Sequence, residues 1–198
     1  MNELRNRIHS FPGWGYVIYR TTYSAESDTL FPDAIRYIEA CIKRDFFSEN
    51  ENDPTDEANE IWAKHRSTIM QDPEQFNGTS LEAIRAHFEA WVNAQGRRDN
   101  WTKFRMCMII DDESLQTLKG TSVETLENER PEDLDNELRC VKVLEAFPIM
   151  DELDTFPGWM RCWTSALWDL WTMMGDGDEM RQLFDSIDGF PFEGVYCG

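Results

Sequence analysis

The pattern of apolar positions predicts two kinds of element in this chain. Short stretches rich in β-branched and aromatic residues are typical of β-strands; they are 16–23, 104–110, 140–146 and 159–164. Other stretches carry apolar residues at the three- and four-residue spacing of one helix face. These predicted helices are 30–46, 54–70, a segment from about 80 that stops at Gly96, and 166–174, with short helical turns at 115–118 and 179–187.

A tetrapeptide, Phe-Pro-Gly-Trp, occurs twice, at 11–14 and at 156–159. A Pro-Gly pair favours a turn, because proline restricts φ and glycine accepts positive φ. Each copy directly precedes a predicted strand. We therefore expect the two copies to begin two strands at the heart of one sheet.

The order of these elements favours an α+β fold. Few strands are present, and long helical segments separate some of them, so we predict a mostly antiparallel sheet of about four strands. We expect the helices to pack on one face, in a ferredoxin-like variant with insertions. The whole of 1–198 is predicted to be a single domain, with acidic loops near 48–57 and 121–138.

The charge of the chain limits its partners. Thirty-eight acidic residues against nineteen basic ones give a formal net charge of −19, which disfavours direct binding to nucleic acid or to an anionic membrane. No apolar run reaches the length of a membrane span, and the N-terminal residues lack the apolar stretch of a secretory signal. The sequence thus predicts a cytoplasmic protein, whose acidity serves solubility, a basic partner or mimicry of a nucleic acid.

Neither a metal nor a cofactor is predicted. The five cysteines are widely spaced, and they form no zinc-binding pattern. Glycine-rich nucleotide-binding motifs are absent as well. The acidic run that starts at Asp111 follows a predicted strand, where a carboxylate can act as a metal ligand, a general base or the cap of the next helix.

Three residues are candidates for catalytic chemistry. Arg20 interrupts an apolar strand, so if helices cover that face its guanidinium needs an anion, either a protein carboxylate or a ligand. Asp111 and His65 are the candidate bases, although a histidine on an apolar helix face is also typical of packing. Arg161, in the strand that follows the second tetrapeptide, is the parallel case to Arg20.

Tryptophans are concentrated near the C-terminus, with four of the eight between positions 159 and 171. Such density is found in ligand pockets, in interface hot spots and in large aromatic cores. The predicted ligand-binding residues are Tyr19, Arg20, Trp159, Arg161 and Trp163.

Three stretches carry a resemblance to a known group of proteins: Gly15–Tyr23, Ile109–Leu115 and Gly158–Arg161. Together they resemble a group of small intracellular proteins of filamentous fungi that has no established activity. The resemblance implies a soluble fungal protein, and it assigns no functional residue.

The sequence leaves three functions open. The leading hypothesis is a soluble binding protein that uses an aromatic-rich pocket or surface for a small molecule or a protein partner. The alternative is an enzyme acting on a small organic molecule, with an arginine as anion anchor and an Asp or His as base. The third is an acidic nucleic-acid mimic.

Overall fold

The computed structural model describes residues 13–49, 55–98, 102–128, 137–148, 156–176, 179–187 and 193–198. Its strands are β1 (Val17–Arg20), β2 (Thr68–Met70), β3 (Met106–Ile110), β4 (Cys140–Glu145), β5 (Trp159–Trp163) and β6 (Val195–Tyr196). Its helices are α2 (Ala25–Glu49), α3 (Thr55–Trp62), α4 (Pro73–Phe76), α5 (Leu81–Ala94), α6 (Thr102–Arg105), α7 (Asp112–Thr117), α8 (Val123–Asn128), the 3-10 turn η1 (Thr164–Ala166), α10 (Leu167–Asp176) and α11 (Met180–Asp185).

The fold is α+β, as predicted, but the sheet differs from the expected one. It has six strands in the order β2-β1-β3-β4-β5-β6 among the described residues. β1 pairs in parallel with β2 and β3, and β5 pairs in parallel with β6, whereas β4 is antiparallel to both neighbours. The predicted sheet of about four mostly antiparallel strands is therefore wrong. The long helical connections that follow β1 and β2 are what parallel pairing requires.

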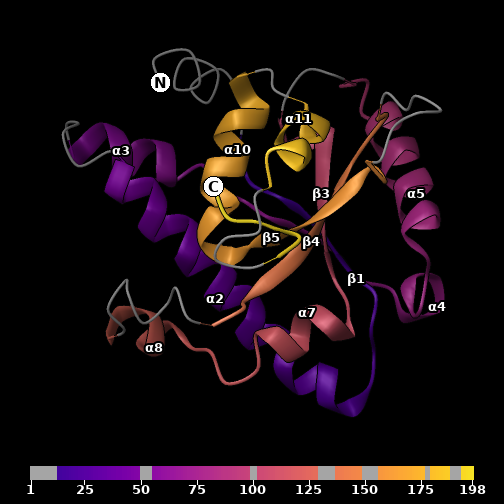
Figure 1. The fold of residues 1–198 in the computed structure, drawn as a ribbon, viewed down its shortest axis with the longest axis horizontal. Helices are drawn as coiled ribbons and strands as arrows, with labels where there is room; N and C mark the ends of the chain where they lie inside the picture. Colours follow the sequence, from indigo (N-terminus) through magenta and orange to yellow (C-terminus); the bar gives the residue numbers. More distant parts are fainter. Residues whose placement is uncertain are drawn as a thin grey trace.

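Helices cover both faces of the sheet, which corrects the prediction of one covered face (Figure 1). On one face, the Tyr16 hydroxyl donates a 2.7 Å hydrogen bond to the Leu167 carbonyl oxygen in α10. On the other face, the Tyr19 hydroxyl lies 2.8 Å from Nδ1 of His87 in α5. Successive side chains of a strand point to opposite faces, so β1 is buried from both sides.

Part of the predicted helix 54–70 is a strand. α3 ends at Trp62, and Ile69 pairs with Ile18 as part of β2. A strand of three residues is too short to show alternation, and Ile69 continues the apolar spacing of the helix before it. β6 was missed for the same reason, since it has two residues.

The two acidic segments were predicted as loops, the second with a frayed helix as the alternative, and the structure has helices over part of each. The start of α3 at Thr55 agrees with the predicted helix 54–70. α2 extends to Glu49 and α3 begins at Thr55, while 50–54 lie outside the described residues. In the second segment, α8 is a helix that contacts α2 and buries Leu126. Residues 129–136 lie outside the described part of the chain.

The two tetrapeptides lie at the starts of β1 and β5 of one sheet, and each of these strands is second from an edge of that sheet. Phe11 and Pro12 lie outside the described residues. Trp14 is buried, and its indole nitrogen donates a 2.9 Å hydrogen bond to the Ile61 carbonyl oxygen. Its ring centroid lies 4.6–5.9 Å from those of Phe46, Trp62, His65, Trp168 and Trp171. Much of the tryptophan density thus belongs to the core.

Candidate functional site

Arg20 has an internal partner. Its guanidinium is buried, forms an ion pair with Asp28 and donates a 3.1 Å hydrogen bond to the Ser27 hydroxyl. The rings of Tyr23 and Phe31 flank it, with centroids 4.5 and 4.8 Å from the guanidinium carbon. Since hydrogen bonds, charge and ring faces are all supplied by the chain, Arg20 is a structural residue that ties β1 to α2.

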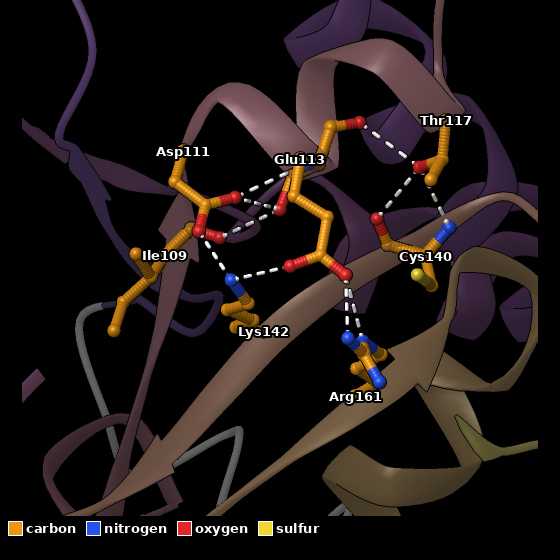
Figure 2. A network of polar contacts seen from close by, with 8 residues as sticks. Ile109, Asp111, Glu113, Thr117, Cys140, Lys142 and Arg161 are labelled. Atoms are coloured by element: carbon orange, nitrogen blue, oxygen red, sulfur yellow. Dashed lines mark hydrogen bonds and ion pairs between the residues drawn. The ribbon is translucent and has the colours of Figure 1, made fainter. Parts of the chain in front are cut away.

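Asp111 belongs to a network of two carboxylates and two cations (Figure 2). Its Oδ1 accepts a 2.9 Å hydrogen bond from the backbone nitrogen of Ser114, which caps α7, and its Oδ2 pairs with Lys142 Nζ. Glu113 pairs with Lys142 at 2.7 Å and with Arg161 at 2.6 Å. We call Asp111, Glu113, Lys142 and Arg161 the closed network. It joins α7 to β4 and β5, and its charges sum to zero.

The pKa values of Asp111, Glu113 and Lys142 indicate that these three groups are charged. Burial raises the pKa of Asp111, but the hydrogen bond from Lys142 and those from Ser114 outweigh burial and lower it below its usual value. The hydrogen bond from Lys142 lowers the pKa of Glu113 more than burial raises it. Burial disfavours the charged form of Lys142, yet its two carboxylates raise its pKa overall. A paired aspartate is therefore a weak candidate for a general base.

His65 lies in the aromatic core. Its ring stacks on Trp62 with centroids 4.6 Å apart and meets the edge of Trp14 at the same distance. Burial, helped by Lys103 and Arg66, lowers its pKa to about 4. Its Nε2 atom has no hydrogen-bond partner among the described residues. The imidazole is neutral at pH 7, and it lies before β2, at the opposite end of the parallel strands from Asp111.

Four of the five predicted ligand-binding residues share one face of the sheet. Tyr19 is linked by the pairing register through Ile109 and Lys142 to Arg161. Trp159 and Trp163 alternate with the opposite-facing residues of β5 and so lie on the same face as Arg161. Arg20 points to the other face. Tyr19 and Trp163 are buried, and the described pocket is lined by none of the five.

A different place on the molecule is hollow. A pocket of about 380 Å³ opens where β1, β2 and β3 begin, next to the C-terminal end of α5. We call it the basic pocket. It is lined by Gly13, Arg66, Thr68, Trp91, Gln95, Arg97, Lys103 and Phe104. Basic and aromatic side chains dominate this list, although the chain as a whole is strongly acidic.

Two cations of the basic pocket have no carboxylate partner among the residues that the structure describes. Lys103 Nζ donates a 3.1 Å hydrogen bond to the Arg66 carbonyl oxygen, and Arg66 donates to the His65 carbonyl oxygen. Within the described ranges, neither side chain forms an ion pair with an acidic residue. Burial lowers the pKa of Lys103. These two positive charges are held by neutral acceptors alone, which leaves them able to bind an anion.

The aromatic side of the basic pocket is a short stack. The ring centroids of Trp91 and Phe104 lie 5.7 Å apart, and the Trp91 ring stacks in turn on Phe88 at 6.0 Å. Phe88 and Phe104 are buried, whereas Trp91 is half-buried and lines the pocket. The stack gives the pocket a rigid apolar side next to its cations.

The sequence analysis missed the basic pocket because its residues come from separate segments. Arg66 precedes β2, Trp91 lies in α5 and Lys103 lies in α6. One signal was present: four of the nineteen basic residues fall within the nine positions 97–105 of an acidic chain. That density marks a basic segment, but it does not reveal that Arg66 and Trp91 lie beside it.

The described residues contain no group of three or more His, Cys, Asp or Glu side chains placed to hold a metal ion. None of the helices in the described ranges has the length and apolar run needed to cross a membrane. The resemblance to fungal proteins stays a prediction, because comparisons with protein-family models, curated proteins and solved structures found no match to this chain.

Proposed function

We propose that this protein binds a small organic anion in the basic pocket. The observation that carries the proposal is the pair of cations, Arg66 and Lys103, whose hydrogen-bond acceptors are backbone carbonyl oxygens. This keeps the leading hypothesis, a binding protein with an aromatic-rich pocket, and moves the binding site to residues that the sequence did not single out.

Charge is the first argument for an anionic ligand. Lys103 is half-buried, and a positive charge that leaves water without an anion loses solvation, which a ligand carboxylate or phosphate restores. Arg66 is exposed and adds a second positive charge without this cost. The closed network has no such need, since its cations already hold two carboxylates. Arg66 is suited to a planar oxyanion, because a guanidinium donates two parallel hydrogen bonds.

Size and lining are the second argument. A volume of about 380 Å³ is at the small end of ligand pockets, which suits a compact organic molecule. Trp91 and Phe104 offer apolar surface to the part of the ligand that carries no charge. The ligand class that matches both features is a carboxylate or phosphate monoester attached to an aromatic or aliphatic group.

Thermal melts and calorimetric titrations with matched probes test the proposal. Phenylacetate and phenyl phosphate are the anionic probes, and benzyl alcohol is the neutral one. We expect the anions to raise the melting temperature and the alcohol to leave it unchanged. Arg66→Gln should weaken anion binding by about 10- to 100-fold, since a hydrogen bond to a charged group contributes about 1.5–3 kcal/mol.

Matched controls come from the surface of the same chain. Arg36 and Lys119 are exposed cations that pair with Asp33 and Glu26. Arg36→Gln and Lys119→Gln change the net charge as Arg66→Gln does, but they should leave anion affinity unchanged. Equal weakening by all three variants would mean that the effect is one of net charge, and the proposed site would then be wrong.

A further inference from the structure

Lys103 differs from the two lysines whose ion pairs the structure describes. Lys142 is held by Asp111 and Glu113, and Lys119 is held by Glu26. Lys103 has a carbonyl oxygen as acceptor and lines the pocket together with Arg66 and Arg97. Its surroundings therefore favour the neutral amine, whereas those of Lys142 and Lys119 favour the ammonium ion.

The pKa values agree with this geometry. Burial lowers the pKa of Lys103. The carboxylates beside Lys142 outweigh burial and raise its pKa, and the hydrogen bond to Glu26 raises that of Lys119. A lysine that is desolvated near other cations is the type of amine that attacks carbonyl carbons, because only the neutral form has a free electron pair.

We infer that Lys103 forms a reversible imine with the carbonyl carbon of a 2-oxo carboxylic acid bound in the basic pocket. This inference rests on the proposed function, since it requires the pocket to hold an organic anion. The guanidinium of Arg66 binds the carboxylate of the acid, and Trp91 and Phe104 contact its side chain. The class of ligand is thereby narrowed from organic anions to those that carry a carbonyl group next to the carboxylate.

The chemical step balances without any further reagent. The neutral Nζ of Lys103 attacks the carbonyl carbon, and a new C–N bond forms while the carbonyl π bond breaks. The resulting carbinolamine loses its oxygen as water, which carries away the two hydrogens of the amine. The C=N bond that remains returns to amine and 2-oxo acid when water adds back.

Reductive trapping with the full chain tests the inference. The protein is incubated with phenylpyruvate and sodium cyanoborohydride, digested and analysed by mass spectrometry. We expect an adduct on Lys103 whose added mass equals that of the acid less one oxygen atom. Lys119 and Lys142 in the same sample are internal controls, and the adduct on Lys103 should exceed the adduct on either of them.

Two additional measurements separate attachment from binding. Phenyllactate has the same carboxylate and ring as phenylpyruvate but no ketone group. It should therefore bind without forming an adduct, and it should suppress the adduct that phenylpyruvate forms on Lys103. Lys103→Arg, which keeps the positive charge, should lose the adduct at this position. The competition with phenyllactate uses the wild-type chain, so it stands even where the variant does not fold.

The outcomes distinguish this inference from the proposed function. If phenyllactate binds but Lys103 gains no more adduct than Lys119, the imine is overturned and the anion site stands. If phenyllactate does not protect an adduct found on Lys103, the imine forms outside the anion site, which also overturns the inference. If neither acid nor the probes named above bind, both the inference and the proposed function are wrong.

Discussion

Two clusters of charged residues lie at opposite ends of the parallel strands, and they differ in the partners of their positively charged groups. The closed network follows the end of β3 and pairs Lys142 and Arg161 with two carboxylates (Figure 2). The basic pocket lies where β1, β2 and β3 begin, and Arg66 and Lys103 there have neutral acceptors.

The difference separates cations that are already neutralised by carboxylates from cations that can still accept an anion. A cation that already holds two carboxylates would have to lose them before it could bind a ligand, and that loss is costly in a half-buried site. A cation held by a carbonyl oxygen can gain an anion without losing one. The number of charges is therefore a poor guide to a binding site, and the nature of their partners is a better one.

The largest expected change in the free energy of unfolding concerns His65, which lies beside the cations of the basic pocket. Its pKa of about 4 in the fold is below the ordinary value of 6.5. Its contribution to stability is thus present above pH 6.5 and is lost as the pH falls towards 4, by about 3 kcal/mol. Urea denaturation of wild type and His65→Phe at pH 7 and pH 4 measures this: the wild type should lose about 3 kcal/mol more than the variant. An equal loss of stability in wild type and His65→Phe would show that His65 is not buried in its neutral form.

A pH effect on stability of similar size but opposite direction is expected for Glu145. Burial raises its pKa to about 7, although Arg105 opposes the shift, in contrast to the lowered pKa values of Asp111 and Glu113. An acid with a raised pKa contributes its stability below about pH 4.5 and loses it as the pH rises through 7.

Glu145→Gln should therefore be neutral at pH 4.5 and stabilise the fold by up to about 3 kcal/mol at pH 8 relative to wild type. Urea denaturation at the two pH values provides the measurement. An equal difference between variant and wild type at both values would contradict the raised pKa.

The next largest effect should come from breaking the closed network. Lys142→Met leaves Asp111 and Glu113 side by side without the amine between them, and the Lys142 side chain is only 14% exposed. We expect a loss of about 2 kcal/mol in the free energy of unfolding, less than for a fully buried pair because both carboxylates reach solvent.

Lys103→Met is the matched variant in the basic pocket. It removes a cation that no carboxylate accompanies in the described structure, so stability should stay level or rise. Urea denaturation of the two variants side by side is the measurement. An equal loss of stability in Lys142→Met and Lys103→Met would contradict the distinction between the closed network and the basic pocket.

A smaller loss of stability than for Lys142 is expected for Arg20, whose ion pair is closed but lies nearer to solvent. Asp28 is 64% exposed, so water can solvate its carboxylate when the guanidinium is removed. Arg20→Met should cost about 1 kcal/mol through the lost hydrogen bonds, whereas Arg36→Met, in an exposed pair, should change nothing measurable. Stabilisation of the chain by Arg20→Met would indicate that Arg20 serves a ligand after all.

Several elements were predictable because their signal is local. The strands from Met106 to Ile110 and from Cys140 to Glu145, and the helix that stops before Gly96, were all predicted from their apolar patterns. The acidic run at Asp111 was predicted as a possible helix cap, and Asp111 does cap α7. The burial of Arg20 on a covered face was also expected, because strand neighbours determine which face a side chain shares.

The sequence by itself therefore determined the α+β class, most of the longer elements and the acidic character of the chain, since each depends on neighbouring residues or on simple sums. The tertiary structure decided the parallel pairing of β1 with β2 and β3, and the assignment of each charge to a partner. Lys142 meets Asp111 across 31 positions, and Lys103 meets the carbonyl oxygen of Arg66 across 37. Because contacts at such separations depend on the whole fold, no local pattern distinguishes the lysine that is neutralised from the lysine that is available.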